Sequence, residues 1–206
     1  MFLINKKVVI TLSLSLLLSG CVSWLAPKVE SEVVKLRAGE YSLDKSHTAV
    51  LFKIQHLELS TYVGRFNSFD ASLDFDPQNP STMNLEASID IDSLDINNPS
   101  LQDDLMGRTW FHQKKYPQAK FTTLSVEPLG DNQFTFTGNL DWRGVVKPIS
   151  LVVTFHGGAN NFLTQKYTLG FSAKGSFLRS DFGMDAFIPI VGDEINVEVF
   201  SEFQKK

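Results

Sequence analysis

The sequence has a single cysteine, Cys21, among its 206 residues, so it has neither a disulfide framework nor a metal cluster built from several thiolates. It also lacks a basic excess, since 19 Lys and Arg stand against 23 Asp and Glu for a formal net charge of −4. Proteins that bind nucleic acid neutralise phosphates with a basic surface, so the composition disfavours a nucleic-acid partner.

Recognisable catalytic motifs are missing too. There is no G-x-S-x-G nucleophile elbow. Asp44, Ser46 and His47 are the residue types of a hydrolytic triad, but neighbours on a strand point to opposite faces and are not expected to converge. The four histidines have no short ligand spacing. We therefore predict no catalytic residue, no metal ion and no enzymatic activity.

What is abundant is phenylalanine: 17 residues, against four tyrosines and three tryptophans. With 43% apolar and 20% charged residues, the chain has a globular composition and enough material for a core. Phenylalanine has no polar group, so this many rings must either fill a core or line an apolar cavity. The residues alone leave both possibilities open.

The N-terminus reads as a signal segment. Lys6 and Lys7 precede an apolar run, Val8 to Leu18, that is too short for a transmembrane helix and typical of a secretory signal. The run ends in Leu18-Ser19-Gly20-Cys21, which resembles the lipobox of bacterial lipoproteins: an aliphatic residue, two small residues and the cysteine that is lipidated. The alternative is an ordinary secretory signal with an incidental cysteine.

The lipobox resemblance predicts a signal peptide over residues 1–20, palmitate or similar acyl chains on Cys21, and a tether over residues 21–39. Several acyl chains anchor a protein to a membrane without a transmembrane helix. Val22 follows the cysteine, in place of the Asp that marks inner-membrane retention in enteric bacteria. The expected location is therefore the cell envelope, at the outer membrane and facing the periplasm.

From residue 40 to residue 206 the dominant hydrophobic period is two, which indicates strands. Its clearest example alternates Met83, Leu85, Ala87, Ile89 and Ile91 with polar residues, and Val145 to Phe155 is apolar at odd positions. Turn signals separate the runs at short intervals, which favours one antiparallel sandwich or barrel domain. One short helix is predicted over Pro99–Met106, with Asn98 or Ser100 as its N-cap.

An ordered series of short segments carries a family resemblance. The segments are Tyr41-Ser42-Leu43-Asp44, Ser46-His47, Phe52, His56, Val63-Gly64-Arg65-Phe66, Ile91-Asp92-Ser93-Leu94, Phe111, Tyr116-Pro117, Phe121, Gly138-Asn139-Leu140-Asp141-Trp142-Arg143-Gly144-Val145, Pro148, Arg179-Ser180-Asp181-Phe182-Gly183-Met184 and Val191-Gly192-Asp193. Together they resemble the YceI-like, polyisoprenoid-binding family from Tyr41 to about Phe203. Two positions depart from it: Thr48 stands where the family often has Ser, and Trp142 where it usually has Thr.

The resemblance implies an all-β fold, a lipocalin-like antiparallel β-barrel of about eight strands around an elongated apolar cavity. It also implies that the cavity holds a long isoprenoid, such as the tail of a quinone or polyprenol, with no other cofactor. Three hypotheses follow: a non-catalytic carrier or store of such a lipid, an enzyme acting on it, or an envelope interaction module with a filled barrel. Protein partners are not predicted.

Candidate cavity residues are those on the apolar face of each expected strand, together with two residues of a loop that closes one end. They are Phe52, Ile54, Phe66, Leu85, Ile89, Ile91, Phe121, Phe136, Leu140, Trp142, Leu169 and Phe171 on strands, and Phe182 and Met184 in the loop. His56 is a candidate contact for a lipid head group. Arg179 has two interpretations, an ion pair with Asp181 within a turn or a contact with the head group.

Overall fold

The computed structural model describes residues 27–206, so the predicted signal peptide and Cys21 lie outside the described residues. This part of the chain is built of ten strands and one α-helix, α2. The elements are β1 (Gly39–His56), β2 (Ser60–Phe66), β3 (Phe69–Phe75), β4 (Asn84–Asp90), β5 (Leu94–Asp95), α2 (Pro99–Leu105), β6 (Gln118–Gly130), β7 (Gln133–Trp142), β8 (Val145–Asn160), β9 (Tyr167–Leu178) and β10 (Val191–Lys205). Four 3₁₀ turns accompany them: η1 (Val33–Lys35), η2 (Pro80–Thr82), η3 (Ile91–Ser93) and η4 (Arg179–Phe182).

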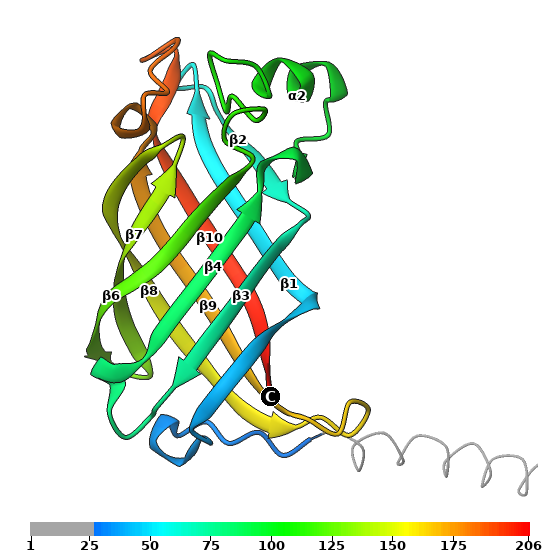
Figure 1. The fold of residues 1–206 in the computed structure, drawn as a ribbon, viewed down its shortest axis with the longest axis vertical. Coiled ribbons are helices and arrows are strands. Elements are labelled where there is room, and N and C mark those ends of the chain that lie inside the picture. Colours follow the sequence, from blue (N-terminus) through cyan, green and yellow to red (C-terminus); the bar gives the residue numbers. More distant parts are fainter. Residues whose placement is uncertain (1–26) are drawn as a thin grey trace, which may run out of the picture.

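The strands form one antiparallel sheet that closes on itself (Figure 1). The strand order is β10-β9-β8-β7-β6-β4-β3-β1-β2-β5, and β10 pairs with β1 along most of its length. Eight strands make the closed barrel, while β2 and β5 extend the sheet beside the second half of β1. The predicted lipocalin-like antiparallel barrel of about eight strands is confirmed.

Alternating side chains and tight turns produce this fold locally. Along β7, Phe134, Phe136, Gly138, Leu140 and Trp142 are buried, and the residues that alternate with them face outward. A two-residue turn at Arg143–Gly144 joins β7 to β8, with φ values of 52° and 76°. Positive φ at both central residues defines the turn type that matches the twist of paired strands, so the hairpin forms here.

Helix α2 lies at one end of the barrel, which we call the α2 end; the β1–β2 turn and the segment between β9 and β10 lie at the same end (Figure 1). Asn98 is its N-cap, because the Asn98 side chain accepts a hydrogen bond from the Leu101 backbone N–H at 3.2 Å. The structure thus selects Asn98 over Ser100. Within residues 27–206, no helix has the length and apolar character needed to span a membrane.

The first described residues lie at the opposite end, which we call the tether end, with the β6–β7 and β8–β9 turns (Figure 1). Glu30 and Gly158 exchange two backbone hydrogen bonds of 2.9 Å, and Leu36 is buried in the core. Within the predicted tether over residues 21–39, Glu30 and Leu36 are thus attached to the barrel, while most residues between 31 and 38 are exposed. Leu36 had no periodic partners in sequence, so its burial showed only in the tertiary structure.

The barrel interior contains two hydrophobic clusters. At the tether end, Phe75, Phe134, Phe155 and Leu169 belong to a densely aromatic cluster, with the Phe75 and Phe155 ring centroids 5.2 Å apart. At the α2 end, residues of β7, of the segment after α2 and of η4 form the second cluster. Members of both clusters face the cavity described next.

Candidate functional site

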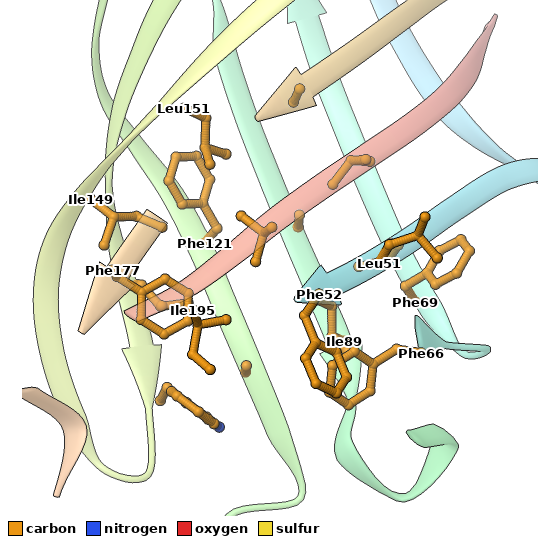
Figure 2. A pocket seen from close by; sticks show the side chains of 18 of the residues that line it. Leu51, Phe52, Phe66, Phe69, Ile89, Phe121, Ile149, Leu151, Phe177 and Ile195 are labelled. Atoms are coloured by element: carbon orange, nitrogen blue, oxygen red, sulfur yellow. The ribbon is translucent and has the colours of Figure 1, made fainter. Parts of the chain in front are cut away.

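A cavity of about 630 Å³ lies inside the barrel. Its wall comes from all eight barrel strands and from β2, and Figure 2 shows side chains from several of them that line it. Almost all of the lining is aliphatic or aromatic. This volume falls within the range of about 300–1,000 Å³ that is typical of small-molecule sites.

Small residues create the space. Alanines from four strands face the interior at positions where larger side chains would fill it: Ala71, Ala87, Ala119 and Ala173. Gly138 lies against the ring of Phe121, and a Cβ on Gly138 would come within 2.3 Å of that ring. The glycine thus leaves the room that the Phe121 ring occupies. An empty apolar cavity forgoes the dispersion contacts of a packed core, whereas a hydrocarbon ligand restores them.

All but two of the candidate cavity residues from the sequence line this cavity. Those that do are Phe52, Ile54, Phe66, Leu85, Ile89, Ile91, Phe121, Phe136, Leu140, Trp142, Phe171 and Met184. Trp142, the departure from the family pattern, packs between Phe111 and Phe177 with ring centroids 5.7 Å away in each case. The binding of a ligand by these residues stays a prediction.

Leu169 and Phe182 lie elsewhere. Leu169 is fully buried in the tether-end cluster, where it pairs with Gly158 and Phe203. Phe182 is buried behind the wall, with its ring centroid 5.5 Å from Trp142 and 5.4 Å from Phe177. Leu169 has the correct strand face, but it lies too close to the tether end, where the barrel is filled.

The sequence candidates include no residue from three strands of the wall, β3, β8 and β10, although the alternation of β8 and β10 was visible. Ile149, Leu151 and Val153 of β8 and Ile195, Val197 and Val199 of β10 all face the cavity. Trp110 and Phe111 also reach it, from the segment after α2. That segment has no strand periodicity, so the alternation pattern could not find these two rings, although Phe111 is among the residues of the family resemblance.

Arg179 is fully buried at the α2 end of the cavity, and four of its five N–H donors are occupied. The guanidinium donates to the carbonyls of Gly192 and Met184 at 2.7 Å, and of Ala186 and Val191 at 2.9 Å. Burial lowers its pKa. Arg179 therefore fastens the segment between β9 and β10 over this end.

The interpretation of Arg179 and Asp181 as an ion pair is wrong, because Asp181 pairs with Lys147 at 2.7 Å. A direct contact between Arg179 and a ligand head group has little support, since four carbonyls already hold the guanidinium. His56, the other candidate for that contact, lies at the end of β1 and lines the cavity at the α2 end.

Asp44, Ser46 and His47 converge after all, because β1 bulges between Asp44 and Ala49. Asp44 accepts hydrogen bonds from Ser46 Oγ at 2.5 Å, His47 Nδ1 at 3.0 Å and Gln204 Nε2 at 2.6 Å. Burial by itself raises the pKa of Asp44, but the hydrogen bonds from Ser46 and His47 outweigh it and lower that pKa to about 2. The same contact raises the pKa of His47.

This arrangement is not a catalytic triad. Ser46 Oγ and Asp44 both approach Nδ1 of His47, whereas a triad needs them on different ring nitrogens. Asp44, His47 and Glu202 also have ligand atoms within 4.8 Å of one another, but both Asp44 oxygens already accept hydrogen bonds. The group lies on the strand face opposite the inward-pointing Leu43 and fastens β1 to β10.

A closed eight-stranded antiparallel barrel around an apolar cavity defines the lipocalin-like class of proteins. The model of the YceI-like domain matches residues 41–203, and the chain belongs to this family. It is 34% identical to Protein YceI of Salmonella newport (strain SL254) over 167 residues, which cover 80% of this chain and 86% of that protein.

Solved structures of other proteins share this fold. The YCEI protein of Campylobacter jejuni superposes with a TM-score of 0.67 at 34% identity, over 79% of this chain and 96% of that one. BcnA of Burkholderia cenocepacia gives a TM-score of 0.71 at 25% identity, over 78% and 98%. A polyisoprenoid binding domain from Saccharophagus degradans shares the fold, with a TM-score of 0.62 at 14% identity over 82% and 100%.

Proposed function

We propose that this protein binds a long isoprenoid lipid, such as a quinone or a polyprenol, and stores or carries it in the bacterial cell envelope without chemical change. The observation that carries the proposal is the cavity of about 630 Å³ inside the barrel, with its almost entirely apolar wall. An eight-stranded barrel is wide enough to enclose one slender ligand.

The chemistry of the wall fits a hydrocarbon tail. Each isoprene unit has five carbons, and burying it contributes roughly 4 kcal/mol before the cost of ordering the chain. Few polar groups interrupt the wall, so the tail displaces little bound water from polar partners. The related fold from Saccharophagus degradans is described as a polyisoprenoid binding domain, which supports the same ligand class here.

The envelope location rests on the sequence. Leu18-Ser19-Gly20-Cys21 supports cleavage before Cys21 and acylation of its thiol, with Val22 favouring the outer membrane. A lipid anchor would keep the carrier next to the membranes in which isoprenoids reside.

The two alternatives have less support. A filled barrel requires a packed interior, whereas the alanine positions leave a cavity here. An enzyme requires convergent polar groups at the ligand, whereas the one polar group that resembles a triad, around Asp44, faces away from the cavity.

Native mass spectrometry of the purified protein, followed by organic extraction, tests the proposal. We expect one prenyl lipid per protein, lost on extraction and regained when the lipid is added back. A protein purified gently from its own envelope that carries no lipid, and takes up neither a quinone nor a polyprenol, would contradict it.

A further inference from the structure

The β8–β9 turn presents two large apolar side chains to solvent. Phe162 is 52% exposed and Leu163 is 77% exposed. The turn has a defined shape: the Asn161 N–H donates to the Lys166 carbonyl at 2.9 Å, and the Asn161 side chain accepts from the Leu163 N–H at 2.9 Å. These bonds hold the backbone while both side chains point away from the barrel, so the exposure belongs to a structured tip.

The N-terminal segment leaves the barrel beside this turn. Glu30 pairs with Gly158 just before the turn, and Val29 next to it is 56% exposed (Figure 1). Only five residues lie between Cys21 and Pro27, and the six steps from one to the other span at most about 20 Å. A membrane that holds an acylated Cys21 therefore lies within reach of Phe162 and Leu163.

Charge complements this apolar tip. Lys166 is exposed at the end of the turn, and Lys28 is exposed next to Val29. The sequence from residue 159 to residue 169 contains no acidic residue. An apolar pair flanked by lysines suits the interface of a bilayer that contains anionic lipids, where the rings and aliphatic groups enter and the lysines meet phosphates.

We propose that Phe162 and Leu163 dock into the same membrane that holds the lipid anchor, so that the barrel stands on its tether end. The inference rests on the lipid anchor of the proposed function. Strand β10, with 15 residues, rises about 40 Å along a tilted barrel, so the α2 end then lies well beyond the membrane surface.

This orientation determines where ligand exchange takes place. At the tether end the rings of Phe75, Phe134 and Phe155 are packed together and do not line the cavity. At the α2 end the cavity extends to His56, Trp110 and Arg179. A lipid therefore enters and leaves on the side away from the anchoring membrane. The exposed apolar residues at that side, among them Leu59 at 84% and Phe187 at 62%, then face an acceptor other than that membrane.

A fluorescent probe on a single thiol tests the orientation. Cys21 is the only cysteine and is consumed by acylation in the anchored protein, so Leu163→Cys carries the label alone. The matched control is Leu59→Cys, an equally exposed leucine at the opposite end. Each acylated variant is reconstituted in vesicles of phosphatidylethanolamine and phosphatidylglycerol, with a quencher attached to the lipid acyl chains.

We expect the environment-sensitive probe at position 163 to shift to shorter wavelength and to be quenched, and the probe at position 59 to behave as in water. A floating protein whose position-163 probe stays in water overturns the docking and leaves the anchor intact. Quenching at both positions means that the barrel lies on its side, which also overturns the upright orientation. A protein that does not float with the vesicles refutes the anchor and the docking together. Lipid binding in the cavity is tested separately, by extracting the bound lipid from the same protein.

Discussion

Leu151 offers a direct test of the cavity wall. It lies on β8 and faces inward, opposite Phe136 on β7 and Gly175 on β9 (Figure 2). A Cβ on Gly175 would approach Leu151 Cδ2 within 2.6 Å, so Leu151 occupies the room that this glycine leaves. Its surroundings contain aromatic rings and alanines and offer no partner for an amide.

The Leu151→Asn substitution places an unpaired amide on this wall. An unpaired buried polar group costs roughly 1–3 kcal/mol on mutational scales. Since each 1.4 kcal/mol corresponds to a factor of ten, binding of an isoprenoid should weaken by roughly 5- to 150-fold. Val152→Asn is the matched control, because Val152 is the next residue on the same strand, faces outward and is 40% exposed.

The assay is a fluorescence titration of delipidated protein with all-trans-retinol, a fluorescent isoprenoid, together with circular dichroism to show that each variant keeps its sheet. We expect Leu151→Asn to lose affinity and Val152→Asn to match the wild type. Folded Leu151→Asn protein that binds as tightly as the wild type, or a larger loss at Val152 than at Leu151, would refute the assignment of this cavity as the binding site.

Three further outcomes are expected. Ala87→Phe should fill part of the cavity, so that less lipid co-purifies while the melting temperature of the delipidated protein stays the same or rises; undiminished lipid content would argue against this cavity. The contact with Asp44 raises the pKa of His47 above 6.5. The stabilisation of the folded state by this contact is therefore complete below pH 6.5 and is lost as the pH rises through the raised pKa of His47. His47→Gln should therefore lower the melting temperature more at about pH 5.5 than at about pH 8, and an equal loss at both would contradict the charged pair. Cys21→Ser should abolish palmitate labelling and release the protein from membranes, and unchanged labelling would rule out the lipobox.

The sequence by itself determined the strands, their inward faces and the family. The alternation of apolar and polar residues along 83–91 and 134–142 involves only residues two positions apart, so it can be recognised without knowledge of the fold. Asn98 is a preferred N-cap residue directly before Pro99, and it marked the start of the short helix. The Arg143–Gly144 pair marked a turn, and its two-residue hairpin also depends only on neighbouring residues.

Only the tertiary structure decided which inward residues enclose space and which fill it. Leu169 and Phe171 lie on the same face of β9, yet Phe171 lines the cavity and Leu169 is packed in the tether-end cluster. Strand period reports the face of a residue, whereas its height in the barrel depends on the register with β8 and β10, set by pairings distant in sequence. The burial of Leu36 likewise depends on segments that only the closed barrel brings together. The four carbonyls around Arg179 come from residues 184–192, so they depend on how the segment between β9 and β10 folds back on itself.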